Sequence, residues 1–179
     1  ANGSGKSTFA LHFLPHYSAC SAFVNPDLIA AGLSPLDPAQ AAVKAGRLVP
    51  ERIAELSAGG RDFGFETTLS GRAYLIQLRA LRTAGYALCL YYLWTEGCDL
   101  LLSRIRQRVL DGGHHVPGQD VRRRYERSLE NLPAYAGLMD KIRLFDNSGP
   151  VPVLVYEKNG EARVHDEARF RRMGGGLSA

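Results

Sequence analysis

Two spacings of hydrophobic residues alternate along the chain, and they predict strands followed by helices. Short apolar runs at 21–24, 63–65 and 86–94 are typical of strands, and the last of these reads as a fully buried parallel strand. Segments with apolar residues every three or four positions predict helices. These segments are 7–17, 38–57, 74–83, 99–110 and 120–132. Further strands are predicted at 141–145 and 151–156, the second pairing with 162–164. Strands that alternate with helices predict an α/β fold with a parallel sheet.

The same pattern predicts which side chains pack inside. In the first helix these are Phe9, Leu11, Phe13 and Leu14; in the helix at 38–57 they are Ala42, Ala45, Val49, Ile53 and Leu56. Residues 1–173 are expected to form one domain, and the Gly-rich residues 174–179 a flexible tail.

Composition limits the class of protein. A length of 179 residues suits a single domain, and 45% hydrophobic with 22% charged residues is ordinary for a globular one. No apolar run reaches the roughly 20 residues of a membrane span. Three cysteines without metal-ligand spacing favour a reducing, cytoplasmic setting. A net charge of +4 suits a phosphorylated ligand without requiring nucleic acid.

The first eight residues carry the most specific chemistry. They match the back half of a phosphate-binding loop, G-x-x-x-x-G-K-[ST], whose backbone amides surround an anion at a helix N-terminus. Lys6 can reach the β- and γ-phosphates of ATP, and the Ser7 hydroxyl can ligate Mg²⁺. The predicted nucleotide-binding residues are Asn2, Gly3, Ser4, Gly5, Lys6, Ser7 and Thr8.

A phosphate-binding loop normally follows a buried strand, which this sequence does not contain. We therefore expect the chain to be a fragment of a longer protein, in which that central strand precedes Ala1.

Two carboxylates are expected at the ligand edge of the sheet. Asp27 follows a predicted strand, with Asn25 as the helix cap and Pro26 in the first turn. It can accept a proton from an acceptor hydroxyl, or it can only complement its helix dipole. Glu66, with Thr67 and Thr68, ends the next strand. These three can bind substrate or a metal-bound water, or they can simply cap the strand end.

The segment at about 104–131 has the make-up of a lid. Gly112 and Gly113 lie between two arginine-bearing helices, and arginines can neutralise a transferring phosphoryl group. The alternative is a solvated helix with Asp120–Arg124 and Arg122–Glu126 pairs. The candidate lid residues are Arg104, Arg108, His114, Arg123, Arg124 and Arg127. Asn147 can border the adenine, or it can be an ordinary turn cap.

Taken together, these motifs resemble the zeta-toxin family of small kinases and its shorter relatives labelled predicted ATPases. The resemblance covers nearly the whole chain. It rests on residues 2–8, Phe-Val-Asn-Pro-Asp at 23–27, Phe-Glu-Thr-Thr-Leu-Ser-Gly at 65–71, Arg-Val at 108–109, Gly-Gly-His at 112–114, Val-Pro at 116–117 and Arg-Arg-Tyr at 123–125 with the helix to 132.

The resemblance implies a P-loop three-layer sandwich and transfer of the γ-phosphoryl group of ATP to a small sugar nucleotide. UDP-N-acetylglucosamine is the substrate of the toxin members, and an antitoxin is their partner. It also implies that Asp27 is the base, that Glu66 and Thr68 bind substrate, and that Lys6 and Arg108 are catalytic. His114 stands where the toxins have a second lid arginine. The alternatives are a polynucleotide-end or metabolite kinase and an ATP-binding switch without an acceptor.

Overall fold

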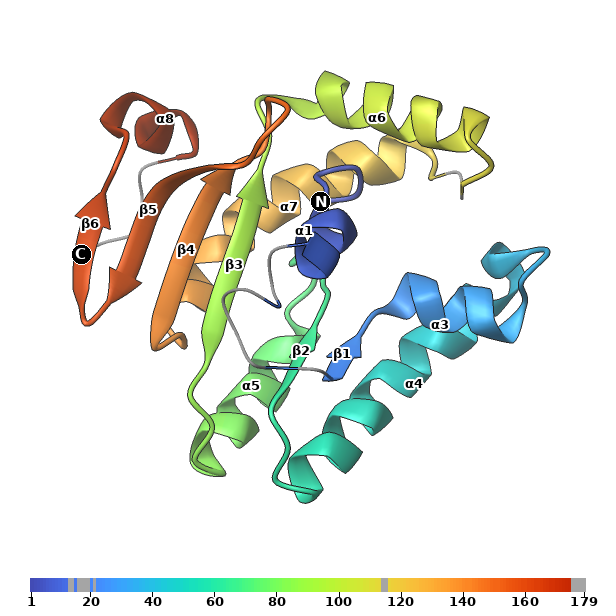
Figure 1. The fold of residues 1–179 in the computed structure, drawn as a ribbon, viewed down its shortest axis with the longest axis horizontal. Helices are drawn as coiled ribbons and strands as arrows, with labels where there is room; N and C mark the ends of the chain where they lie inside the picture. Colours follow the sequence, from blue (N-terminus) through green and yellow to red (C-terminus); the bar gives the residue numbers. More distant parts are fainter. Residues whose placement is uncertain (13–14, 16–19, 21, 114–115, 175–179) are drawn as a thin grey trace. The chain divides into compact units, whose positions relative to one another are not determined.

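The computed structural model describes residues 1–12, 15, 20, 22–113 and 116–174 (Figure 1). They form two compact units, one made of residues 6–67 and the other of residues 1–5 together with the chain from Thr68 onwards. Among the described residues, no helix is both long enough and apolar enough to cross a membrane.

The smaller unit contains a two-stranded parallel sheet and its helices. Val24 pairs with Phe65, and the amide of Glu66 continues the ladder by donating to the Val24 carbonyl at 2.9 Å. The carboxyl ends of both strands therefore meet at one edge, where the polar residues 25 and 66 follow them. The elements are α1 (Lys6–His12), β1 (Ala22–Val24), α3 (Pro26–Leu33), α4 (Pro38–Ala58) and β2 (Phe63–Phe65).

Helix α4 forms close to its predicted range, but its buried row begins one residue earlier. Ala41 is buried and Ala42 is exposed, because burial follows a strict four-residue spacing through Ala45, Val49 and Ile53. In α1, Phe9 is buried as predicted, whereas Leu11 is 66% exposed. The other two predicted packing residues of this helix, Phe13 and Leu14, lie outside the described residues.

The larger unit contains a four-stranded sheet in the order β3-β4-β5-β6. Strands β3 and β4 are parallel, as predicted, and β5 and β6 add an antiparallel hairpin. The elements are α5 (Ala73–Thr83), β3 (Cys89–Trp94), α6 (Cys98–Leu110), α7 (Gly118–Ala136), β4 (Lys141–Asp146), β5 (Val153–Asn159), β6 (Glu161–Val164) and α8 (Glu167–Arg172).

Strand β3 is shorter and less buried than the sequence predicts. It begins at Cys89 because Leu88 is engaged outside the ladder, donating from its amide to the Asp140 carboxylate at 2.7 Å. Cys89 is exposed, and only the last three residues of the strand, 92–94, are fully buried. The prediction of a fully buried strand therefore holds for its second half.

Helix α7 crosses the four-stranded sheet and is anchored to it (Figure 1). The Tyr92 hydroxyl bonds Ser128 at 2.9 Å, and Tyr125 donates to the carbonyl of Thr95 at 3.0 Å. Burial raises the pKa of Tyr92 to about 12, so this phenol keeps its proton. The helix extends to Ala136, past the predicted end, because its last turn is also buried. A closing motion of residues 104–131 stays a prediction.

Helix α8 was not predicted, because six residues that include three arginines carry too little hydrophobic pattern. It is held against β5 by Phe170, whose ring stacks on Tyr156 with centroids 5.1 Å apart. Of the predicted tail, residues 175–179 lie outside the described part of the chain.

Candidate functional site

The first five residues of the phosphate loop belong to the larger unit and are held tightly within it. Gly5 has a φ of +82°, and a Cβ there would lie 2.5 Å from the amide nitrogen of Asn147. Gly3 also has positive φ, and a Cβ would approach the Leu101 carbonyl to 2.9 Å. Both positions therefore require glycine, as the loop motif predicts.

Three side chains fix the course of this loop. The Asn147 amide donates to the Ser4 carbonyl at 2.8 Å, and Arg124 donates to the side-chain oxygen of Asn2 at 2.9 Å. The Ser4 hydroxyl is buried and donates to the carbonyl of Ala1 at 2.9 Å. A contact from Ser4 to a phosphate would therefore come from its backbone.

In the smaller unit, the next two residues of the motif join a half-buried polar group that we call the Glu66 cluster: Lys6, Ser7, Asn25 and Glu66. The Ser7 hydroxyl donates to the Glu66 carboxylate at 2.7 Å, and the Lys6 ammonium lies 3.4 Å from it. The Asn25 amide donates to Glu66 at 2.9 Å and to the Ser7 hydroxyl at 3.3 Å. Asn25 is only 3% exposed.

The chemistry of this cluster suits a magnesium-bound phosphate. An ammonium group binds phosphate oxygens, and hydroxyl and carboxylate oxygens are the hard ligands that Mg²⁺ prefers. Mg²⁺ usually takes one or two such protein groups together with substrate phosphates and water. A site of this kind does not require a cage made of protein ligands alone. The described residues contain no group of three or more His, Cys, Asp or Glu side chains arranged for a metal.

Asn25 is the member of the cluster that the sequence does not predict as a site residue. It was predicted only as a helix cap, and it is one, because its side-chain oxygen accepts from the amides of Asp27 and Leu28 at 2.8 and 3.1 Å. Its amide nitrogen is left to face Ser7 and Glu66. The signal that could have found it is its place directly after a strand, beside Asp27.

Asp27 lies in the first turn of α3 and is exposed. Asn25, the N-cap two residues earlier, donates a hydrogen bond to the Ser7 hydroxyl. The turn that carries Asp27 therefore starts from a residue that contacts the phosphate-loop serine. No hydrogen bond or ion pair from the Asp27 carboxylate to another described residue is present.

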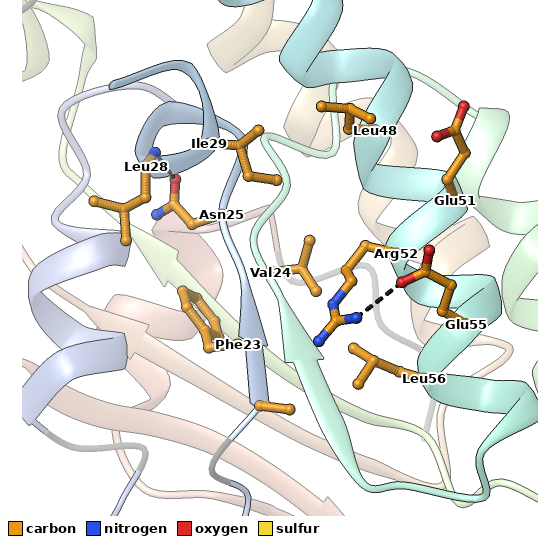
Figure 2. Close-up of a pocket in the computed structure, with 11 residues that line it drawn as sticks. Phe23, Val24, Asn25, Leu28, Ile29, Leu48, Glu51, Arg52, Glu55 and Leu56 are labelled. Carbon is orange, nitrogen blue, oxygen red and sulfur yellow. Dashed lines mark hydrogen bonds and ion pairs between the residues drawn. The ribbon is translucent and has the colours of Figure 1, made fainter. Parts of the chain in front are cut away.

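A pocket of about 470 Å³ opens within the same unit, between β1, α3 and α4 (Figure 2). Its apolar lining includes Phe23, Ile29 and Leu48. Its polar groups are Asn25, Glu51, Arg52 and Glu55, with Arg52 paired to Glu55 at 2.8 Å. Because Asn25 belongs to both, the pocket adjoins the Glu66 cluster.

The polar loop after β2 runs from the smaller unit into the larger one. Thr67 is half-buried in the smaller unit, and the Thr68 hydroxyl bonds that of Ser70 at 2.7 Å in the larger one. Leu69 is buried with a φ of +53°, a conformation that is uncommon for a non-glycine residue, and Asn131 holds its carbonyl at 2.9 Å.

The predicted lid residues fall into different environments. Arg104 donates to the carbonyls of Ser148 and Gly149 at 3.3 and 3.4 Å. Arg123 pairs with Asp120 at 2.7 Å, whereas the Asp120–Arg124 pair considered from the sequence does not form.

Arg122 pairs with Asp99, not with Glu126. Arg108 is half-buried, and its carbonyl accepts from the Gly113 amide at 2.7 Å where α6 ends. Arg127 and Thr8 are exposed. His114 lies outside the described residues.

Comparisons with known proteins place the chain in a family. No family model matches the sequence. An uncharacterised protein of Haemophilus influenzae is 30% identical over 124 residues, which is 69% of this chain and 86% of that protein. The chain belongs to the same family as that protein.

Two solved structures match almost the whole chain. One, from the PezAT chromosomal toxin–antitoxin system of Streptococcus pneumoniae, has a TM-score of 0.68 and 16% identity over 99% of this chain and 76% of its own. The other, AvrRxo1-ORF1:-ORF2 with ATP, has a TM-score of 0.71 and 17% identity over 96% of this chain and 60% of its own. The chain therefore shares the α/β fold of these two structures, which is the zeta-toxin-family fold that its sequence predicts.

Proposed function

We propose that this chain is a P-loop kinase that transfers the γ-phosphoryl group of ATP to a hydroxyl group of a small sugar nucleotide. The Glu66 cluster is the observation that carries this proposal. In it, the lysine and serine of the phosphate loop meet the polar residues that follow β1 and β2. The kinase-like fold and a similar structure solved with ATP support the choice of donor.

On the donor side, Lys6 would exchange the Glu66 carboxylate for β- and γ-phosphate oxygens. Ser7 would hold Mg²⁺ through its hydroxyl, and Glu66 would hold one of the waters on the ion. Bound Mg²⁺ would neutralise charge on the phosphate oxygens. Arg108 and at least one other lid arginine would stabilise the equatorial oxygens of the transferring group.

On the acceptor side, Asp27 would be the general base. As the acceptor oxygen bonds the γ-phosphorus, its proton passes to the Asp27 carboxylate. The bond from the γ-phosphorus to the bridging oxygen breaks, and ADP leaves with that electron pair. The exposed carboxylate of Asp27, in the turn that begins at Asn25, supports this role.

The pocket beside Asn25 would hold the non-reacting part of the acceptor (Figure 2). Its apolar wall suits a ring face, and the carboxylates of Glu51 and Glu55 suit hydroxyl or amide donors. Among the described residues that line it, the cation is Arg52, which is already paired with Glu55. These features support a glycosyl ring or a nucleobase as the occupant, with Thr67 and Thr68 as further substrate contacts.

A panel assay tests the proposal. The protein is incubated with ATP, Mg²⁺ and UDP-N-acetylglucosamine, other UDP-sugars or a 5′-hydroxyl oligonucleotide, and mass spectrometry detects the gain of one phosphate. We expect product with a UDP-sugar. Asp27→Asn should remove transfer while leaving ATP affinity within about threefold, because the base acts only on the acceptor.

Asp62→Asn, an exposed aspartate of the same unit, is the matched control. Phosphate on the oligonucleotide alone would indicate a polynucleotide-end kinase. ATP binding without any product would indicate a switch. Transfer by Asp27→Asn at the wild-type rate would exclude this residue as the base.

Two further expectations stay predictions. A protein partner of the antitoxin type is supported by the two-component assemblies among the similar structures. The cytoplasmic location rests on the sequence alone.

A further inference from the structure

The loop after β4 makes a second polar group, which we call the loop network: Asp146, Asn147, Ser148 and Arg169. All of it lies in the larger unit. Asn147 is its point of contact with the phosphate loop, donating from its side chain to the Ser4 carbonyl at 2.8 Å. Its own amide donates to the Trp94 carbonyl at 2.8 Å, at the end of β3.

Asp146 holds the next residue of this loop. Its carboxylate is 6% exposed, and one oxygen accepts from both the amide and the hydroxyl of Ser148, at 2.9 and 2.6 Å. The Ser148 hydroxyl also accepts from the Glu96 amide at 2.8 Å. Arg104 adds bonds to the carbonyls of Ser148 and Gly149. The residue beside Asn147 is therefore fixed through both backbone and side chain.

Arg169 of α8 closes the network from the other side. Its Nε donates to the second oxygen of Asp146 at 3.0 Å, and its Nη1 donates to Asp166, the N-cap of α8, at 2.7 Å. A buried carboxylate that loses its cationic partner reorganises or becomes protonated, because its charge is then uncompensated. Either change would release Ser148.

We propose that Arg169 is a positioning residue for the phosphate loop, acting through Asp146 and Ser148 on Asn147. The geometry of Gly5, whose Cβ position Asn147 occupies, makes the loop sensitive to small shifts of that amide. An effect on ATP binding follows as well, and it rests on the proposed function. In the proposed kinase, loss of Arg169 would weaken the binding of ATP although Arg169 is not among the predicted nucleotide-binding residues.

Hydrogen exchange of the ligand-free protein tests the positioning role without depending on the proposed function. In Arg169→Met, exchange in the peptide that covers residues 1–7 should accelerate about tenfold, because local opening becomes easier. Arg171→Met is the matched control, since Arg171 lies on the same helix, is 80% exposed and, among the described residues, forms its ion pair with Glu167. Arg169→Lys, which keeps the charge, should restore most of the protection.

A double-mutant cycle tests the route. Asn147→Ala should accelerate exchange in the same peptide, and adding Arg169→Met should change it little further, because both changes break one path. Effects that multiply would overturn the proposed route. If Arg169→Met lowers the melting temperature but leaves the loop peptide at the Arg171→Met level, the ion pair is structural only.

If Arg169→Met does not fold, Ser148→Ala replaces it, and hydrogen exchange in the peptide that covers residues 1–7 should again be faster than in the wild type. Binding of ATP then separates the two proposals. Faster loop exchange with about tenfold weaker ATP binding supports both. Faster loop exchange in a protein that binds no ATP supports the positioning role and contradicts the proposed function.

Discussion

The Glu66 cluster and the loop network both act on the phosphate-binding motif, but they are built differently. The cluster joins the motif to the ends of two parallel strands, within 6–67. The network joins residues 4 and 5 to a loop and a short helix more than 140 positions away. The first would contact the substrates, and the second would hold the loop that contacts them. Substitutions in the cluster should therefore cost turnover, and those in the network should cost loop order and ATP affinity.

The largest effect is expected from Lys6→Ala. Loss of the ammonium group removes the cation that would stabilise charge on the phosphates, and kcat should fall about 10³-fold. Lys44→Ala, an exposed lysine of α4, serves as the control and should keep wild-type kcat. A folded Lys6→Ala protein with activity within about threefold of wild type would contradict the assignment of the cluster.

An intermediate effect is expected at Asn25, which has two separable roles. Asn25→Ala loses the helix cap and should reduce the free energy of unfolding by about 1 kcal/mol, with a larger loss from the buried amide contacts. Asn25→Ser keeps a capping oxygen but loses the amide that faces Glu66 and Ser7. In urea denaturation it should recover the contribution of the cap, about 1 kcal/mol relative to Asn25→Ala, while kcat/KM stays about tenfold or more below wild type.

If Asn25→Ser restores activity together with stability, Asn25 is a cap alone. If Asn25→Ala loses activity without losing stability, the capping bonds to Asp27 and Leu28 contribute less than their geometry indicates.

The smallest effect is expected at Glu157, which belongs to neither group. Hydrogen bonds, from His165 first and Arg143 second, hold the pKa of this carboxyl below its ordinary value of 4.5. A depressed pKa stabilises the fold above about pH 4.5, and that contribution is lost as the pH falls through the folded-state value. At pH 7, Glu157→Gln should cost about 0.5 kcal/mol, as exposed ion pairs do.

Urea denaturation at several pH values measures this difference, which should vanish in strong acid. Glu161→Gln, an exposed residue of β6, should show no difference at any pH. A cost at Glu157 that persists in strong acid, where the carboxyl is protonated in both states, would contradict the argument.

The sequence predicts more of the Glu66 cluster than of the loop network, because the cluster contains a local motif and the network depends on contacts between distant residues. Lys6, Ser7 and Glu66 were predicted as site residues, because a loop motif and a carboxylate at a strand end are readable locally. Asn25 was read only as a cap, since one side chain there does two things. Arg169 was not predicted at all, because α8 has no hydrophobic period and its partner Asp146 lies in a turn. Pairs such as Arg122 with Asp99 were missed because spacing favoured partners on the same helix.

Local hydrophobic patterns predict the helices and strands, but they do not predict the residues at which some of these elements begin or end. The hydrophobic pattern predicts α4, β1, β2 and β4 to within one residue of their observed bounds, and in α4 it also predicts most of the buried row. The start of β3 depends on a bond from Leu88 to Asp140, and the end of α7 depends on a buried last turn. Both are tertiary contacts, which leave no local pattern.

The most direct test of the proposed kinase is a crystal structure with Mg²⁺ and a non-hydrolysable ATP analogue. We predict that the amides of residues 3–7 surround the triphosphate, that Lys6 contacts its terminal phosphate, and that this phosphate faces the carboxylate of Asp27. A terminal phosphate directed away from Asp27, or a nucleotide bound elsewhere, would contradict the account.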